Sequence, residues 1–357
     1  MKTLATSAVI AAAAALALVP IPPQTMERYS QTFYPWIQTV LTGLSNLAPF
    51  ALFDVLLVGV LVWWLWRLGF DVATRRRGGW LRVTGRMVVR TAACAALMYI
   101  VFLVTWGFNY RREPITARLA GQPDRISKDA ARLLAERTVS ELNALHADAH
   151  ANGTGGLSAV DGSLVHAFQE TQTLLGISGA RPSRPKRSLL DWYFRSAGVP
   201  AMTDPYFLET LVASDVLPFE RPFVVAHEWS HLAGFANEGE ANFVGWLTCM
   251  HGDAAVRYSG WIFLYGEVIP GLPRAERPAI VQALGAGPRA DLEAISARLR
   301  RNLKPAVSKA GWRVYDSYLK ANRVEAGTAS YAEVVRLILQ TQFDPEWRPA
   351  LKTPASP

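Results

Sequence analysis

The chain has 357 residues, of which half are hydrophobic and only 18% are charged, and its formal net charge is +8. This composition excludes an intrinsically disordered protein, and its charge content is low for a soluble globule. Its two cysteines exclude a disulfide scaffold and a multi-cysteine metal domain. The composition favours a membrane protein, and the meaning of the positive charge depends on where the arginines lie.

Three apolar segments lie in the first third of the chain. We predict transmembrane helices over about residues 4–22, 47–68 and 88–107, which would place the chain in contact with a lipid bilayer. The first segment is short and ends in three prolines. It is either a retained helix, which we favour, or a cleaved signal peptide, although no small-x-small cleavage site follows it.

The arginines between the second and third apolar segments predict the orientation. Residues 23–46 carry only one arginine and one glutamate. By the positive-inside rule, the basic loop is cytoplasmic, and residues 23–46 and 110–357 lie on the other side. This explanation of the charge leaves no reason to expect a nucleic-acid partner. The arginines are Arg67, Arg75, Arg76, Arg77, Arg82, Arg86 and Arg90.

Residues 110–357 have the pattern of a water-soluble, mainly helical domain with a small β-sheet, so we divide the chain into a membrane anchor, 1–109, and this domain. Tyr206–Val212 is the best strand candidate, either as a structural edge strand or as a strand that pairs with an extended peptide. Ser127 is the expected N-cap of the first helix. The predicted helices are 127–151, 158–175, 223–234, 238–250, 253–268, 288–302, 307–322 and 331–342.

The motif that indicates chemistry is His-Glu-Trp-Ser-His over residues 227–231, an HExxH match. His227 and His231 are four residues apart, so both imidazoles share one face of a helix and can bind one zinc ion. Glu228 lies about a third of a turn away, where its carboxylate can act as general base on a metal-activated water. The alternative, an ordinary helix with two unrelated histidines, is the weaker interpretation.

A third ligand is expected shortly after the motif. Gly234 allows the chain to turn back, and a helix then opens with two acidic residues, Glu238 and Glu240. We favour Glu238 as the ligand, because Asn242 then lies on the same face and can support a histidine ligand by a hydrogen bond. Glu240 remains the alternative ligand, or serves as a charge that favours the start of the helix.

Several motifs together resemble the bacterial membrane proteins catalogued as domain-of-unknown-function family 3810, which look like membrane-anchored gluzincin-type zinc metallopeptidases. The resemblance implies a zincin-like fold for the domain and a bacterial cytoplasmic (inner) membrane location, with the domain extracytoplasmic. The motifs are Trp106-Gly-Phe-Asn-Tyr-Arg111, Pro185-Lys186 followed by Ser188, His227–His231, Glu238–Asn242, Tyr258-Ser-Gly260 and Tyr318-Leu-Lys-Ala-Asn322.

The segment Glu238–Asn242 is also similar to the Glu-x-x-x-Asp segment of membrane gluzincins, whose first glutamate binds zinc. By position that glutamate is Glu238. Asn242 stands where those enzymes have aspartate, a substitution that keeps the shape and removes a charge. The resemblance therefore implies His227, His231 and Glu238 as the zinc ligands.

A hydrolase with this site also needs a group that stabilises the developing oxyanion. Tyr258 and His251 follow the motif and are candidates, although a packed helix tyrosine and a histidine at a helix C-terminus are ordinary alternatives. His146 and His150 are also four residues apart, but no glutamate follows His146. We interpret them as solvated helix-face residues in preference to a second metal site.

The sequence thus predicts a membrane-anchored zinc metallopeptidase that acts on a peptide or protein substrate. The alternative is a non-catalytic membrane protein that binds zinc for a structural or sensory purpose. A structural zinc site usually has four protein ligands, often cysteines, and would give Glu228 no evident role. We therefore favour the enzyme.

Overall fold

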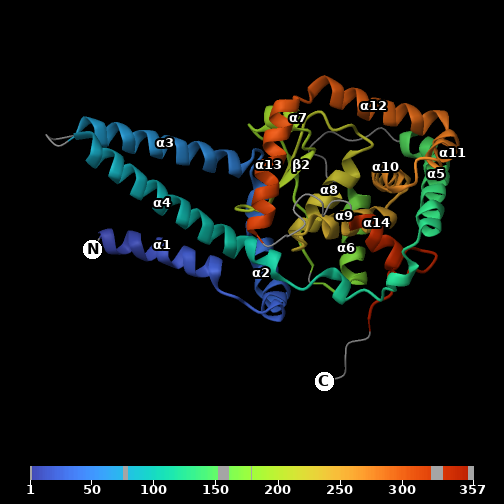
Figure 1. The fold of residues 1–357 in the computed structure, drawn as a ribbon, viewed down its shortest axis with the longest axis horizontal. Helices are drawn as coiled ribbons and strands as arrows, with labels where there is room; N and C mark the ends of the chain where they lie inside the picture. The colour runs from blue at the N-terminus through green and yellow to red at the C-terminus, as the bar shows by residue number, and fades with distance from the viewer. Residues whose placement is uncertain (1, 75–78, 152–160, 178, 323–332, 353–357) are drawn as a thin grey trace.

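A computed structural model describes residues 2–74, 79–151, 161–177, 179–322 and 333–352 (Figure 1). These residues form a mainly helical protein with one small β-sheet, as the sequence predicted. Arg75, Arg76 and Arg77, together with residues 158–160 and 331–332 at the starts of two predicted helices, lie outside the described residues.

Three helices project from one side of the molecule: α1 (Lys2–Leu18), α3 (Leu52–Ala73) and α4 (Gly79–Thr105) (Figure 1). Both α3 and α4 are long and apolar enough to cross a membrane. Many of their large apolar side chains are exposed, which is costly in water and favourable in lipid. Among the described residues, α3 and α4 thus supply two candidate membrane spans and suggest a membrane protein.

The prediction of three clear spans is not supported. α1 has 17 residues, fewer than the roughly 20 that a span needs. The prolines that follow it bend the chain by 113° into α2 (Pro23–Leu47), and the two helices qualify only when they are taken together as one broken span. α1 nevertheless lies alongside α4 in the projecting bundle.

α2 packs against the globular part of the protein. Its Tyr34 donates a hydrogen bond to the Leu232 carbonyl at 3.1 Å, and Thr42 donates one to the Leu208 carbonyl at 2.9 Å. The segment before α3 and the domain after α4 therefore touch.

A buried carboxylate of the domain, paired with a lysine, binds the start of α3. Lys186 Nζ lies 2.6 Å from Glu209 Oε1, and both side chains are almost completely inaccessible to solvent. The Glu209 carboxylate also accepts hydrogen bonds from the Ser45 hydroxyl and from the amides of Leu52 and Phe53, each at 3.0 Å. The end of α2 and the first turn of α3 are thus fixed to the sheet.

The sheet among the described residues has the order β1-β3-β2, with β1 (Pro185–Lys186) parallel and β2 (Ala201–Asp204) antiparallel to β3 (Glu209–Val212). The predicted strand Tyr206–Val212 is right only in its second half, because the Asp204 carboxylate accepts hydrogen bonds from two following amides and starts a turn. Leu208 has a positive φ of 54° within this turn. The sequence analysis missed β1 and β2.

The predicted helices of the domain are present, with ends that shift by a few residues, and Ser127 caps the first through its hydroxyl as expected. Two short helices, over Asp191–Ala197 and Arg277–Gln282, were not predicted. The helices are α5 (Lys128–Ala151), α6 (Gly162–Leu174), α7 (Asp191–Ala197), α8 (Arg221–Leu232), α9 (Glu238–Met250), α10 (Ala254–Gly271), α11 (Arg277–Gln282), α12 (Ala286–Asn302), α13 (Pro305–Ala321) and α14 (Glu333–Gln340), with 3₁₀ helices η1 (Gly107–Arg111), η2 (Ile115–Ala117) and η3 (Pro123–Arg125).

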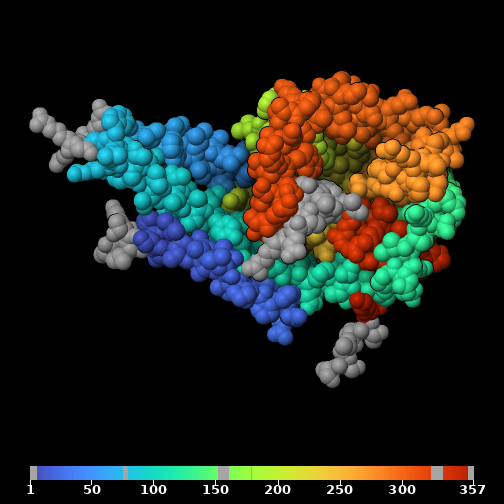
Figure 2. All heavy atoms as spheres, in the orientation of Figure 1, coloured from blue at the N-terminus to red at the C-terminus, as the bar shows by residue number. Residues whose placement is uncertain are grey.

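The core of the domain lies around α8, α9 and α10, whose large side chains, such as Trp229, Trp246 and Trp261, are completely buried. α12 crosses one end of the domain, and α13 descends between the core and the projecting helices (Figure 1). The space-filling view shows a hollow beneath α12 (Figure 2).

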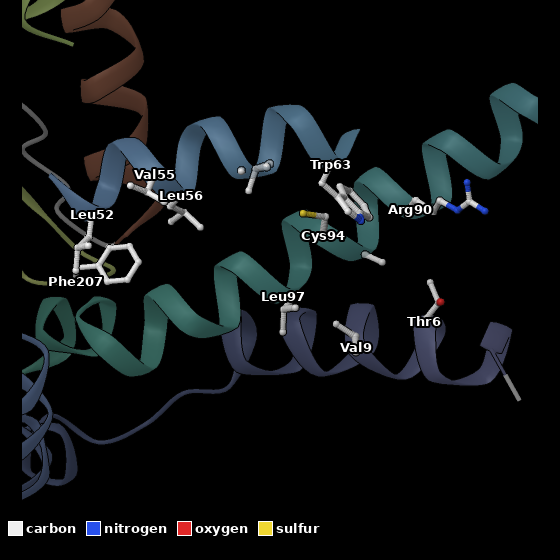
Figure 3. Close-up of a pocket in the computed structure, with 13 residues that line it drawn as sticks. Thr6, Val9, Leu52, Val55, Leu56, Trp63, Arg90, Cys94, Leu97 and Phe207 are labelled. Atoms are coloured by element: carbon white, nitrogen blue, oxygen red, sulfur yellow. The ribbon is translucent and has the colours of Figure 1, made fainter. Parts of the chain in front are cut away.

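An apolar groove of about 880 Å³ runs between α1, α3 and α4 (Figure 3). Val9, Leu56 and Leu97 are among its lining residues, and Phe207 from the β2–β3 turn closes one end. The groove is therefore bounded by the β2–β3 turn at the end where the projecting helices meet the domain.

Candidate metal centre

The helix α8, which carries the HExxH motif, has well-defined ends. Pro222 stands in its first turn, where a missing N–H costs nothing. After α8 the chain turns at Gly234, whose φ of +87° favours glycine. The Gly234 amide bonds the His231 carbonyl and the Phe235 amide bonds the Ser230 carbonyl, as in a Schellman motif. Gly234 therefore reverses the chain as predicted.

α9 begins immediately after this turn and lies against α8. Asn237 caps it, because its side-chain oxygen accepts a hydrogen bond from the Glu240 amide at 3.1 Å. This places Glu238 as the first residue of the helix. At Gly245 the two helices approach so closely that a Cβ there would lie 2.9 Å from the His227 amide nitrogen.

The result is a cluster of three side chains from α8 and α9. The Nε2 atoms of His227 and His231 lie 3.3 Å and 3.5 Å from Oε2 of Glu238. All three atoms lie within 4.8 Å of one another. Both Glu238 and His231 are buried, and His227 is partly exposed. The structure thus brings the three predicted ligands together.

The cluster has the donor set and spacing of a zinc site. Ligand atoms bound tetrahedrally to zinc at about 2.0–2.2 Å lie roughly 3.3–3.6 Å apart, and the two distances to Glu238 fall in this range. Hydrogen bonds between charged groups are shorter, about 2.7–2.9 Å. Moreover, the buried Oε2 atom of Glu238 has no hydrogen-bond partner among the described residues. Two imidazoles and a carboxylate therefore fit the ion.

The hydrogen bond of His231 fixes its tautomer in the form that a metal needs. Its Nδ1 lies 2.7 Å from the Phe235 carbonyl oxygen. Because a carbonyl oxygen can only accept a hydrogen bond, Nδ1 carries the hydrogen and donates it. The neutral ring then presents the lone pair of Nε2 to Glu238. The outer hydrogen bond orients the ligand, as is typical of metal-bound histidines.

Glu238 supplies the negative charge of the cluster. Burial alone would raise its pKa, but His231 and His227 outweigh burial and lower the pKa well below its ordinary value. Burial lowers the pKa of His231, and the Glu238 carboxylate more than reverses this and raises it to about 9. Without a metal, His231 therefore holds a proton near neutral pH, and metal binding would release it.

Glu228 points to a different set of partners. Its carboxylate Oε2 lies 2.7 Å from the hydroxyl of Thr203 in β2, which also lies 3.0 Å from the Glu228 carbonyl oxygen. Burial raises the pKa of Glu228, although His227, His231 and the Thr203 hydroxyl oppose the shift. A carboxylate with a raised pKa is a stronger base at neutral pH.

The two alternatives at the start of α9 are separated in space. Glu240 does not join the histidines; its Oε1 accepts a hydrogen bond from the Ile115 amide at 2.7 Å, and burial raises its pKa to about 7. Asn242 is buried on α9, and its Nδ2 atom has no hydrogen-bond partner among the described residues. Its predicted bond to a histidine ligand is not formed.

The two candidates for the oxyanion stabiliser lie elsewhere. The Tyr258 hydroxyl donates a hydrogen bond to Asp291 Oδ2 at 2.5 Å, and burial with this carboxylate raises the pKa of Tyr258 well above its usual range. His251 faces Glu170, with 3.7 Å between Nδ1 and Oε1. The structure therefore does not bring Tyr258 or His251 to the cluster.

Three residues near the cluster were missed because they are distant in sequence. Tyr315 of α13 donates its hydroxyl proton to Glu238 Oε1. Trp106, just after α4, donates a hydrogen bond to the His231 carbonyl at 3.4 Å, and its ring packs edge-on against the His231 ring. Tyr34 of α2 contacts the same turn. Trp106 lies in a motif noted in the sequence, and Tyr315 lies three residues before another.

A sequence model of the family described as "Protein of unknown function (DUF3810)" matches residues 29–339. This is most of the chain, so the protein belongs to that family, as its motifs indicated. No curated protein and no solved structure matches it. The similarity to gluzincins stays a prediction.

Proposed function

We propose that this protein is a membrane-anchored, zinc-dependent metallopeptidase with a zincin-like domain. The observation that carries the proposal is the convergence of His227 Nε2, His231 Nε2 and Glu238 Oε2, with Glu228 on the same helix as both histidines. Zn²⁺ is the cofactor and a peptide or protein is the substrate.

The number of ligands supports a catalytic site. Among the described residues, no fourth histidine, cysteine or acidic residue joins His227, His231 and Glu238. Structural zinc sites usually have four protein ligands, whereas catalytic sites have three and leave one position open. The partial exposure of His227 gives this position a route to solvent.

Zinc held by His227, His231 and Glu238 would acidify a water molecule and polarise a substrate carbonyl. Glu228 would accept a proton from the attacking water and pass it to the leaving amine. Its burial raises its pKa, which makes the carboxylate a stronger base. Thr203 holds one carboxylate oxygen and leaves the other for the proton.

The proposal places the domain on the extracytoplasmic side of a bacterial cytoplasmic membrane. The arginines at the far end of α3 and α4 support this orientation by the positive-inside rule. Reporters that are active on only one side of the membrane, fused after Asn109, test the orientation in cells. If only the cytoplasmic reporter is active, the domain lies in the cytoplasm and the proposed orientation is wrong.

The enzyme is tested with purified full-length protein in detergent. We expect one zinc equivalent that is lost in His231→Ala. We also expect cleavage of a peptide library, read by mass spectrometry, that is lost in Glu228→Gln although this equivalent is retained. Glu346→Gln, an exposed residue, is the matched control and should cleave like the parent protein. If no zinc equivalent depends on His231, the proposed metal site is wrong.

The alternative is a protein that binds zinc for a structural or sensory purpose. It predicts the same zinc content and no cleavage that depends on Glu228. If Glu228→Gln leaves every cleavage unchanged, the alternative is correct and the peptidase is not.

A further inference from the structure

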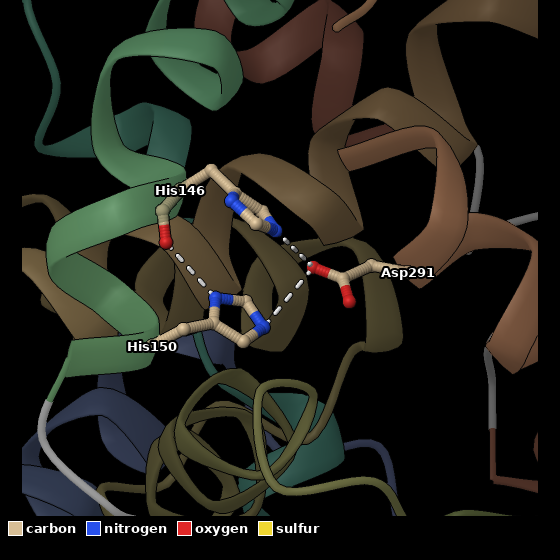
Figure 4. A group of neighbouring side chains, drawn as sticks. All are labelled: His146, His150 and Asp291. Atoms are coloured by element: carbon tan, nitrogen blue, oxygen red, sulfur yellow. Dashed lines mark hydrogen bonds and ion pairs between the residues drawn. The ribbon is translucent and has the colours of Figure 1, made fainter. Parts of the chain in front are cut away.

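A second group of metal-binding side chains lies outside the cluster on α8 and α9. His146 and His150 of α5 face Asp291 of α12, with 3.5 Å and 3.3 Å between their Nε2 atoms and Asp291 Oδ2 (Figure 4). The three atoms lie within 4.8 Å of one another. The expectation that these histidines are merely solvated helix-face residues is therefore incomplete, because α12 supplies a carboxylate that their own helix lacks.

We propose that His146, His150 and Asp291 form a second Zn²⁺ site, separate from the proposed catalytic site. Two imidazole nitrogens and a carboxylate are ligands that suit zinc. The two distances are close to the roughly 3.3–3.6 Å expected between ligands at a tetrahedral ion. They are longer than the hydrogen bonds that charged histidines make to carboxylates.

The surroundings of the histidines fix the atoms that face the ion. His150 Nδ1 lies 2.9 Å from the His146 carbonyl oxygen, to which Nδ1–H donates, so Nε2 keeps its lone pair for the metal. The two rings stack at 4.3 Å, and Phe219 and Tyr258 pack against the His150 ring. Both rings are therefore held in place before an ion binds.

The carboxylate is fixed as well. Asp291 is almost completely buried, and the Tyr258 hydroxyl donates to its Oδ2 atom, the oxygen that both histidines face. Carboxylate ligands of metal ions are typically held by such an outer hydrogen bond. This gives Tyr258 a role in orienting Asp291.

α12 comes close enough only because residue 287 is glycine. A Cβ at Gly287 would lie 2.4 Å from Cε1 of the His146 ring. The ion would thus join α5 to α12 as a clamp, and the partial exposure of both histidines leaves its remaining position to water.

Zinc stoichiometry of the purified full-length protein tests the proposal. After equilibrium dialysis against Zn²⁺, we expect two equivalents in the parent protein and one in His150→Ala and in Asp291→Asn. His166→Ala, an exposed histidine on the neighbouring helix α6, is the control and should keep two. Gly287→Ala should also lose one equivalent.

The site is then isolated in a His231→Ala background, where we expect one equivalent and a zinc-dependent rise in Tm. Both should disappear in His231→Ala/His150→Ala. If His150→Ala and Asp291→Asn keep the parent stoichiometry, the proposal is wrong. If the parent protein binds one zinc equivalent that depends on His150 and not on His231, the second site is supported and the proposed catalytic site is wrong. The two proposals therefore fail separately.

Discussion

Gly245 of α9 lies against the backbone of His227 in α8, so that the distance between the two helices depends on one missing side chain. The geometry of the candidate metal ligands depends on the same contact. A Cβ at residue 245 would lie 2.9 Å from the His227 amide nitrogen and 3.0 Å from its Cα, and neither atom belongs to a flexible side chain. The separation of Glu238 from the histidines is thus set by the helix packing.

Gly245→Ala is expected to push α9 away from α8. The overpacking should lower the stability by about 1–3 kcal/mol. Because Glu238 moves with α9, zinc affinity should also fall, measured by competition with a chelator. The control is Gly266→Ala in α10, where a Cβ meets nothing within 4 Å. Equal zinc affinities in both variants would show that the contact does not position the site.

Tyr315→Phe removes the hydroxyl that bonds Glu238 Oε1 and leaves the ring. Loss of such an outer hydrogen bond should weaken zinc binding by roughly 10–100-fold. Tyr318→Phe removes a hydroxyl from the same helix, one that meets Tyr110, and should have a smaller effect. A chelator titration of both variants compares them, and equal losses would contradict the proposed role of Tyr315.

Thr203→Val tests the environment of the proposed base. The Thr203 hydroxyl helps to lower the pKa of Glu228 against the effect of burial, so its removal should raise that pKa further. Because Glu228 works in its charged form, the acid limb of kcat/KM should move to higher pH. Thr203→Ser keeps the hydroxyl and should keep the profile. If the acid limb of kcat/KM is unchanged in Thr203→Val, Glu228 is not the general base.

Asp204 should make stability depend on pH. Burial raises its pKa from the ordinary 3.8 to about 7, although it accepts hydrogen bonds from the Tyr206 and Phe207 amides. Between these values the folded state binds more protons than the unfolded state, so stability falls as pH rises from about 4 to 7.

Relative to Asp204→Asn, which does not titrate, the loss should approach on the order of 4 kcal/mol at pH 7. Thermal unfolding in the presence of a chelator, at several pH values, measures the difference between the two proteins. Parallel curves for the two would contradict a raised pKa at Asp204.

The parts of the site that were predicted from sequence are local. The spacing of His227 and His231, the turn at Gly234 and the helix that opens at Glu238 follow from short-range rules, and the choice of Glu238 over Glu240 follows from the direction of successive side chains on a helix.

The parts that were missed depend on tertiary packing. Tyr315 lies on α13, which approaches α9, and Asp291 lies on α12, which approaches α5. The hydrophobic periodicity of the sequence does not predict either approach. Similarly, β2 and β3 are separated by a turn that the side chain of Asp204 determines, so the alternating pattern alone placed the strand too early.

Sequence distance does not show how near the candidate site lies to the projecting helices. The motif lies more than a hundred residues after the last apolar segment, yet Trp106, next to the end of α4, touches His231. The short first segment and its three prolines were visible in the sequence, but the bend of 113° that they introduce was not, and the described residues contain two candidate spans.

The contact of Trp106 with His231 and the buried pair of Lys186 and Glu209 attach the domain to both ends of the α3–α4 hairpin. A domain held this way cannot swing as it would on a flexible tether. With the hairpin in a bilayer, His227, His231 and Glu238 would stay at a constant height above the lipid. The proposed peptidase would then select a substrate partly by how far its reactive bond stands from the membrane surface.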